Sequence, residues 1–264
     1  MGDGLDSKAA QTLIRRCIVA NNSCDGIKLW DGGSRVENTL VYGRGDGDST
    51  PSPWSAIVIG QPAPTNPKFD LVNVTVDEML GGNYLLYAQY DTPEIPINLT
   101  MRNCIFRGFN SPIFIGDATT LTVINCLFYM PDRADELLNH GSVTYGSFDI
   151  SALGTGNRYG NPLFVRRGWG VDGDYHLMTN SIAVNGGTRS DAPVDDLDRM
   201  SRDLQPDIGA YEFAADMMGL ATPIGISATD GIYRDKVRIA WNSVANAAAY
   251  QVWDPAKGQP LAGT

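Results

Sequence analysis

A short phrase recurs along the first half of the chain and constrains the fold more than any other feature. In most copies an asparagine precedes a small residue and then apolar residues, as in the Asn-Cys-Ile-Phe run at 103–106. The small residues, at positions 17, 39, 74, 104 and 126, lie 22, 35, 30 and 22 residues apart. Repeats of this length are typical of a solenoid. The asparagines are Asn38, Asn73, Asn103 and Asn125, and the first copy has Arg16 instead.

Each phrase predicts a short β-strand that ends in a turn, because β-branched or aromatic residues are followed by Gly, Asn or Asp. A second strand-like run follows most phrases, for example the Pro-Ile-Phe-Ile-Gly run at 112–116. Two or three strands in one short repeat leave no room for a crossover helix. We therefore predict an all-β chain of stacked parallel strands, with adjacent coils about 4.8 Å apart.

The asparagines have a physical role in such a stack. Each side-chain amide can bond the backbone of a tight bend and the next asparagine, so that no polar group is stranded. The alternative is that each asparagine marks an independent turn. Four copies at one position of the repeat favour a stacked ladder.

Composition agrees with a turn-rich chain and excludes some functions. The 264 residues include 29 Gly and 15 Pro, and 30 acidic side chains oppose 20 basic ones, for a net charge of −10. This balance counts against binding to nucleic acid, which needs clustered Lys and Arg. No apolar run approaches the roughly 20 residues of a membrane span. The oligomeric state stays open.

The repeats between about residues 12 and 130 resemble those of right-handed parallel β-helix proteins of the pectin-lyase-like superfamily. A later series resembles the C-terminal end of secreted bacterial β-helix proteins that carry a choice-of-anchor Q-type domain. Its runs are Asn-Pro-Leu-Phe at 161–164, Asp-Tyr-His-Leu at 174–177 and Asp-Ile-Gly-Ala-Tyr-Glu at 207–212. The resemblance implies parallel β-helix coils over 1–150 and a C-terminal cap region over 151–213.

An open solenoid end exposes unpaired backbone and an apolar core, so it needs a cap. We expect Asp207 and Glu212 to bond turn amides within this cap or to pair with Arg199 or Arg202. A catalytic role for these carboxylates is the less favoured alternative, because no partnered base accompanies them.

Residues 214–221 read as a linker, and 222–264 resemble the opening strands of a fibronectin type III domain. Trp241 would be its core tryptophan and Tyr250 would lie on the next strand. A complete domain of this kind needs roughly 90–100 residues. We therefore expect a partial β-sandwich module and an excerpt of a larger extracellular or cell-surface protein.

Three of the four cysteines, Cys17, Cys104 and Cys126, occupy the same small-residue position of the repeat. Stacked neighbours 104 and 126 could approach disulfide distance. Buried free thiols are the simpler interpretation, because Thr39 and Val74 fill the same position elsewhere.

The sequence carries neither a G-x-S-x-G nor an H-E-x-x-H motif. The resemblance implies that many β-helices cleave acidic polysaccharides, as lyases or as glycoside hydrolases. Here the most lyase-like set is Asp25, Lys28 and Asp31, which alternate strand positions would bring to one outer face. Calcium is a possible cofactor, on the carboxylates of Asp46, Asp48, Asp77 and Glu78. A solvated acidic surface is the alternative for each cluster.

Aromatic side chains suggest a sugar-stacking face instead of a catalytic groove. Its candidates are Trp30, Trp54, Tyr84, Tyr87 and Tyr90, although at least half of them should be core. Two hypotheses follow. The first is a non-catalytic extracellular scaffold that binds or presents to a polysaccharide or surface glycan. The second is a polysaccharide-active enzyme, a uronate lyase more than a glycoside hydrolase.

Overall fold

The chain forms two compact units, Met1–Phe213 and Ala214–Thr264. This computed structural model describes residues 3–22, 24–43, 55–60, 67–78, 84–90, 92, 94–109, 111–168, 173–213, 223–229, 233, 236–244, 250, 252–254 and 259–260. Their regular elements are strands and two short 3₁₀ turns, without an α-helix. The chain is all-β, as predicted.

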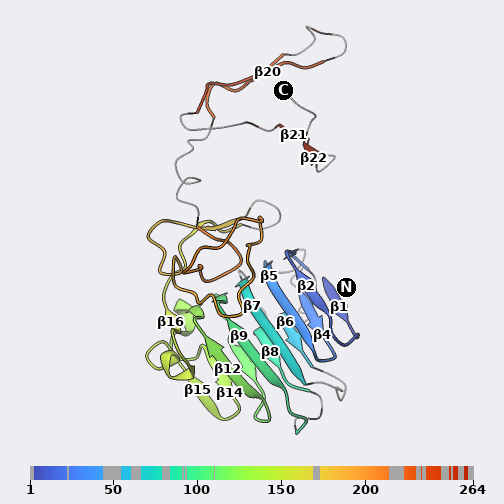
Figure 1. Cartoon of the computed structure of the whole chain (residues 1–264), viewed down its shortest axis with the longest axis vertical. Coiled ribbons are helices and arrows are strands. Elements are labelled where there is room, and N and C mark those ends of the chain that lie inside the picture. The colour runs from blue at the N-terminus through green and yellow to red at the C-terminus, as the bar shows by residue number, and fades with distance from the viewer. Residues whose placement is uncertain are drawn as a thin grey trace. The chain divides into compact units, whose positions relative to one another are not determined.

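Two long sheets build the first unit (Figure 1). Sheet A has seven strands, and all its pairings are parallel except that of the last strand. Its strands, in spatial order, are β1 (Leu5–Ser7), β4 (Ile27–Leu29), β6 (Ser55–Ile59), β8 (Tyr84–Ala88), β11 (Ile113–Ile115), β14 (Leu138–His140) and β15 (Val143–Tyr145).

Sheet B has nine strands, and all of them pair in parallel. The chain passes repeatedly from one sheet to the other, with one or two consecutive strands in each, so it winds in coils around a shared apolar core. The strands of sheet B are β2 (Leu13–Arg15), β3 (Ile18–Ala20), β5 (Ser34–Tyr42), β7 (Lys68–Asp77), β9 (Asn98–Arg102), β10 (Ile105–Arg107), β12 (Thr120–Ile124), β13 (Leu127–Tyr129) and β16 (Arg158–Tyr159).

Sheet B bends along a line of residues in the left-handed backbone region. The φ angles of Asn38, Asn73, Asn103 and Asn125 are 45°, 52°, 51° and 51°, and Arg16 has 53°. Asparagine tolerates this region better than most residues because its short polar side chain bonds locally. Asn103 donates from its side-chain amide to Asn73 Oδ1 at 3.3 Å. The repeated asparagine is thus the residue at which each coil turns a corner.

The later part of the range expected to cap the coils lies along their flank. The side-chain amide of Asn38 donates to Asp195 O at 2.6 Å, and that of Asn125 donates to Gly186 O at 2.8 Å. Between them, Asn73 bonds Asp207 O and Gly209 O, both at 3.1 Å. Residues 173–213, called the flanking segment below, therefore run across successive coils. They begin with β18 (Asp174–Leu177), which pairs with β17 (Phe164–Arg166).

The segment that follows β13 covers the last coil. After β13 come the 3₁₀ turn η1 (Pro131–Arg133), the β14–β15 hairpin and a second turn, η2 (Ile150–Leu153). Ile150 is buried in the coil core, and Tyr145 and Leu153 pack against it. These apolar side chains shield the core where the stack ends, and Leu153 is the one of the three that falls within 151–213, the range expected to form the cap.

The second unit contains two small antiparallel ladders. β19 (Ser227–Ala228) pairs with β20 (Ile239–Ala240), and β21 (Trp253–Asp254) pairs with β22 (Gln259–Pro260). The rings of Trp241 and Tyr250 lie 5.3 Å apart. Ile224 and Val237 are 68% and 63% exposed, so the described part of this unit has little core of its own.

Candidate functional site

One line of outward-facing side chains crosses sheet A from its first strand to the β14–β15 hairpin. In the register of these parallel strands, one residue of each strand lies beside one residue of the next strand. Their strand neighbours at Ile27, Ile57, Leu86, Ile113 and Leu138 point into the core and are fully buried. This follows from the two-residue period of a strand. The line, called the outer row below, consists of Asp6, Lys28, Val58, Tyr87, Phe114 and Asn139.

The centre of the outer row is an aromatic cluster of Tyr84, Tyr87 and Phe114. The rings of Tyr87 and Phe114 are stacked, with centroids 5.2 Å apart and planes 15° apart. The ring centroid of Tyr84 lies 5.4 Å from that of Tyr87 and 5.7 Å from that of Phe114, and its ring plane is tilted relative to both. All three side chains are half-buried, so the cluster presents apolar ring surface to solvent.

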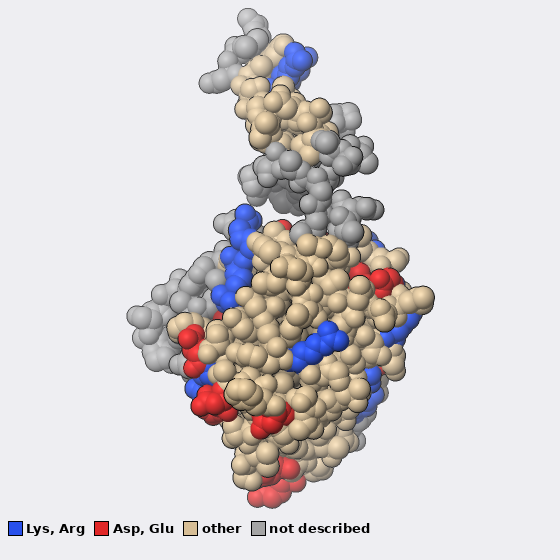
Figure 2. Space-filling view, turned by 90° about the vertical axis from the view of Figure 1, so that its left-hand side faces the viewer, with Lys and Arg blue, Asp and Glu red and all other residues tan. Residues whose placement is uncertain are grey.

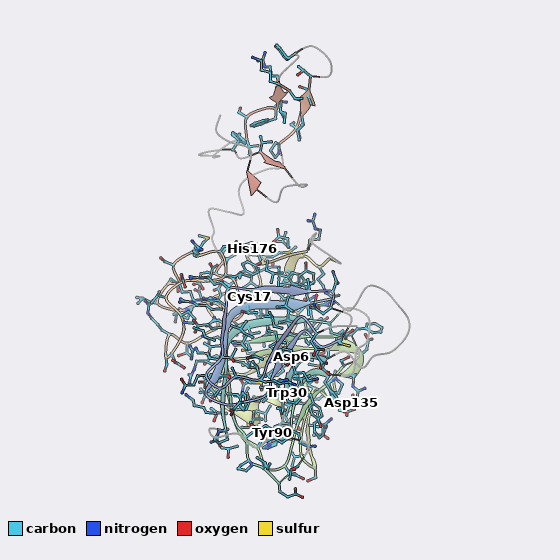
Figure 3. All side chains as sticks on the ribbon, turned by 90° about the vertical axis from the view of Figure 1, so that its right-hand side faces the viewer. Asp6, Cys17, Trp30, Tyr90, Asp135 and His176 are labelled. Carbon is cyan, nitrogen blue, oxygen red and sulfur yellow. The ribbon has the colours of Figure 1, made fainter. Side chains whose placement is uncertain are left out.

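The N-terminal end of the row is charged. Lys28 Nζ lies 3.3 Å from Asp25 Oδ2 and 5.3 Å from the centroid of the Trp30 ring. Lys8 Nζ lies 4.7 Å from the same ring. The indole Nε1 of Trp30 donates a hydrogen bond to Asp6, and Figure 3 shows these two residues close together. The indole therefore lies among two ammonium groups and a carboxylate.

Electrostatics at this end do not favour a lysine base. Burial raises the pKa of Asp25, against the opposing effects of the Ser55 amide and of Lys28. Burial lowers the pKa of Lys28, but the charge and hydrogen bond of Asp25, with Asp3 and Asp6, raise it overall. Lys28 is therefore protonated at neutral pH. Asp31, the third member of the expected catalytic set, bonds the amide of Gly32 in the turn after β4.

The expected calcium carboxylates are used differently. Asp77 is fully buried. Its Oδ1 accepts from Arg167 at 2.7 Å and from Arg107 at 3.2 Å, and its Oδ2 accepts from Arg167 at 2.7 Å and from Tyr175 at 3.0 Å. Two guanidinium groups already neutralise this carboxylate, which corrects its assignment as a calcium ligand. Burial raises the pKa of Asp77 to about 6, against the lowering effect of Arg167.

The remaining calcium candidates are Glu78, Asp46 and Asp48. Glu78 accepts from the amide of Phe109 at 2.9 Å. Asp46 and Asp48 lie outside the described residues. Within the described ranges, no group of three or more His, Cys, Asp or Glu side chains is arranged to hold a metal ion.

Of the five expected sugar-stacking aromatics, the structure places Trp30, Tyr84 and Tyr87 on the outer face of sheet A. Tyr90 is a correction, because its side chain is 1% exposed within the coil core. Burial, and then the charge of Asp31, raise the pKa of Tyr90 to about 12. Trp54 lies outside the described residues. Phe114 was missed, although its alternation with Ile113 and Ile115 was a usable signal.

Asp207 and Glu212 hold the flanking segment together. Asp207 accepts from the Asn185 amide at 2.7 Å, and Glu212 accepts from Arg202 Nη1 at 2.8 Å and from the Asp207 amide at 3.0 Å. Arg202 also donates to Asn38 Oδ1 at 3.0 Å. The two carboxylates therefore bond turn amides and a buried arginine, and that arginine reaches the asparagine ladder.

Figure 2 shows acidic and basic side chains separated by uncharged ones on the face that it presents. The described residues contain no helix long and apolar enough to cross a membrane. No protein-family model matches the sequence, and no curated protein matches it.

Proposed function

We propose that the chain is part of a secreted or cell-surface protein, in which a right-handed parallel β-helix of the pectin-lyase-like kind serves as a non-catalytic glycan-binding scaffold. Parallel in-register strands, coils that pass between two sheets, and left-handed asparagines at four successive corners support this fold. The second unit would resemble part of a fibronectin type III domain.

The aromatic cluster is the observation that carries the proposal. Sugar rings expose apolar C–H faces, which pack on aromatic rings. Tyr84, Tyr87 and Phe114 offer such surface on two neighbouring strands, and both strands are anchored by buried residues on the opposite face. A rigid, preorganised platform loses little conformational entropy on binding.

Polar groups flank the platform along the same row. Lys28 lies toward one end and Asn139 toward the other, and Gln89 donates to the Tyr87 hydroxyl at 3.3 Å. Coils about 4.8 Å apart would present these groups in succession to a glycan that lies across the strands. Such a ligand would meet apolar surface at the centre and hydrogen-bonding groups at both ends.

The arrangement supports binding better than lysis. A lyase needs a base to remove a proton, and Lys28 is held in its protonated form by Asp25. The protonation of Lys28 does not exclude glycoside hydrolysis, which uses two carboxylates. The experiment therefore also measures the products of lysis and of hydrolysis.

The test is binding of the full chain to soluble polysaccharides by affinity electrophoresis and calorimetry. The panel contains polygalacturonate, alginate, xylan and a mixed-linkage glucan. We expect at least one to bind, and Tyr87→Ala or Phe114→Ala to weaken that binding about tenfold, which is about 1.4 kcal/mol.

Phe148→Ala is the matched control, because Phe148 is 100% exposed but lies outside the outer row. Equal losses in all three variants, or no binding to any polysaccharide, would overturn the proposal. Release of unsaturated sugars or of new reducing ends would replace the scaffold with the enzyme.

A further inference from the structure

Cys104 and Cys126 occupy equivalent positions on neighbouring coils. The residues that follow them, Ile105 and Leu127, are paired in register between β10 and β13. Both cysteines are fully buried in the coil core, and all four cysteines of the chain are free thiols in this structure. Two thiols therefore lie one above the other inside the molecule.

Their contacts hold both thiols in similar surroundings. Cys104 Sγ donates to Leu71 O at 3.3 Å and to Arg102 O at 3.2 Å, and Cys126 Sγ donates to Ile124 O at 3.5 Å. Each sulfur thus bonds the carbonyl two residues before it.

The backbone spacing fits a disulfide. Neighbouring parallel strands lie about 4.8 Å apart, and bridged cysteines have Cα atoms roughly 4.4–6.8 Å apart. The Cβ atoms of a bridge approach to about 3.8 Å, which is closer than stacked side chains normally sit. A bridge here would draw two coils together locally, and it would be easier to reduce than an unstrained one.

We propose that Cys104 and Cys126 form a reducible disulfide that links two successive coils when the protein folds in an oxidising medium. The thiolate of one cysteine attacks a small-molecule disulfide such as oxidised glutathione, which breaks its S–S bond and releases one small thiol. The second cysteine then attacks this mixed disulfide, forms the protein S–S bond and releases the second small thiol. The two cysteine protons end on the two released thiols.

Timing follows from burial. Neither sulfur is accessible in the folded coils, so exchange needs folding or local opening. Burial, and then the neighbouring Cys104 thiol, raise the pKa of the Cys126 thiol, which slows attack in the native state. The bridge therefore forms during folding and persists afterwards. Its occurrence in nature rests on the proposed extracellular setting, whereas its chemistry does not.

The experiment refolds the full chain in a buffer of oxidised and reduced glutathione, then counts free thiols in denaturant. We expect two thiols instead of four, and a linked peptide that contains Cys104 and Cys126 by mass spectrometry. Reductant added in denaturant should restore four thiols, and the bridged form should melt several degrees higher than the reduced one.

Variants separate the bridge from a folding defect. Cys126→Val preserves an apolar residue at a position that Val74 fills in another coil, so the variant should fold and keep three free thiols. Cys17→Val is the control and should still form the bridge, leaving one thiol. Four thiols in the refolded wild type, or a bridge that includes Cys17 or Cys24, would refute the proposal. Glycan binding is scored separately, so either result leaves the proposed function to its own test.

Discussion

The outer faces of the two sheets belong to the same coils but have opposite roles. On sheet A the outer row leaves Tyr87 and Phe114 partly open to solvent. On sheet B, the corresponding outward residues Leu40, Ile105 and Leu127 are buried beneath the flanking segment, in a second core with Ile208 and Ala210. One repeat thus supplies a face for display and a face for anchoring. The difference depends on which outward residues are aliphatic and which segment covers them.

The largest effect is expected at Asp77, on the anchored side. Asp77→Ala would leave Arg167 and Arg107 without their buried counter-ion, and breaking a buried pair costs about 3–5 kcal/mol. Urea unfolding of the isolated protein measures the loss. Asp70→Ala is the control, because its partner Lys68 is 60% exposed and should contribute little. Similar losses in both variants would contradict the role of Asp77 as an anchor.

A smaller effect is expected at Asn73, where conformation and bonding can be separated. Asn73→Ala loses two hydrogen bonds to the flanking segment and places a Cβ residue at φ 52° without local compensation, a total of about 2–4 kcal/mol. Asn73→Gly loses the same bonds but suits this backbone. Denaturation midpoints should therefore rank wild type, glycine and alanine in falling order. An alanine variant as stable as the glycine variant would show that the bend is unstrained.

His176 on the flanking segment predicts a pH dependence. The hydrogen bond to Asp198 raises the pKa of His176, burial opposes this, and Asp174 raises the pKa further, to about 9. The folded protein therefore keeps a proton that the unfolded chain releases near pH 6.5. The stabilisation is complete below about pH 6.5 and is lost as the pH rises through 9. Thermal unfolding between pH 6 and 10 should show this decline in the wild type and a flatter profile in His176→Gln. Parallel profiles would refute it.

The smallest effect on stability is expected on the display face. Tyr87→Ala removes a half-buried side chain, so unfolding should change by about 1 kcal/mol or less, while glycan binding falls about tenfold. Calorimetry of unfolding and of binding on the same preparation compares the two. A large loss of stability would mean that Tyr87 is a structural residue. It would contradict the distinction between the outer faces of sheets A and B.

The local sequence pattern was enough to predict the strands and the placing of the asparagines at the bends. The phrase repeats because each coil needs a residue that tolerates the left-handed bend, and strand alternation separates Tyr87 from Leu86 and Tyr90. Applied consistently, the same two-residue period places Phe114 outward and Tyr90 inward. These outcomes depend on neighbours in sequence.

The position of residues 173–213 depends on partners far away in the chain. The amide of Asn38 meets Asp195 O across 157 positions, and Asp77 meets Arg167 across 90. No spacing rule connects such residues, and a run that follows a solenoid is equally compatible with covering its end. For the same reason, sequence alone predicted that Asp77 and Glu78 bind a metal. The arginine partners of Asp77 are distant in the chain and could not be inferred from spacing.

The flanking segment also changes how the coils should respond to force. In an ideal solenoid each coil touches only its neighbours, so stability is nearly a sum of local terms and coils peel off one at a time. Here one segment bonds Asn125, Asn103, Asn73 and Asn38 in turn, and each bond joins a different coil to the same strip of chain. A pulling force on the first coil is therefore shared by all four of these bonds. The coils should unfold in a single step rather than one after another.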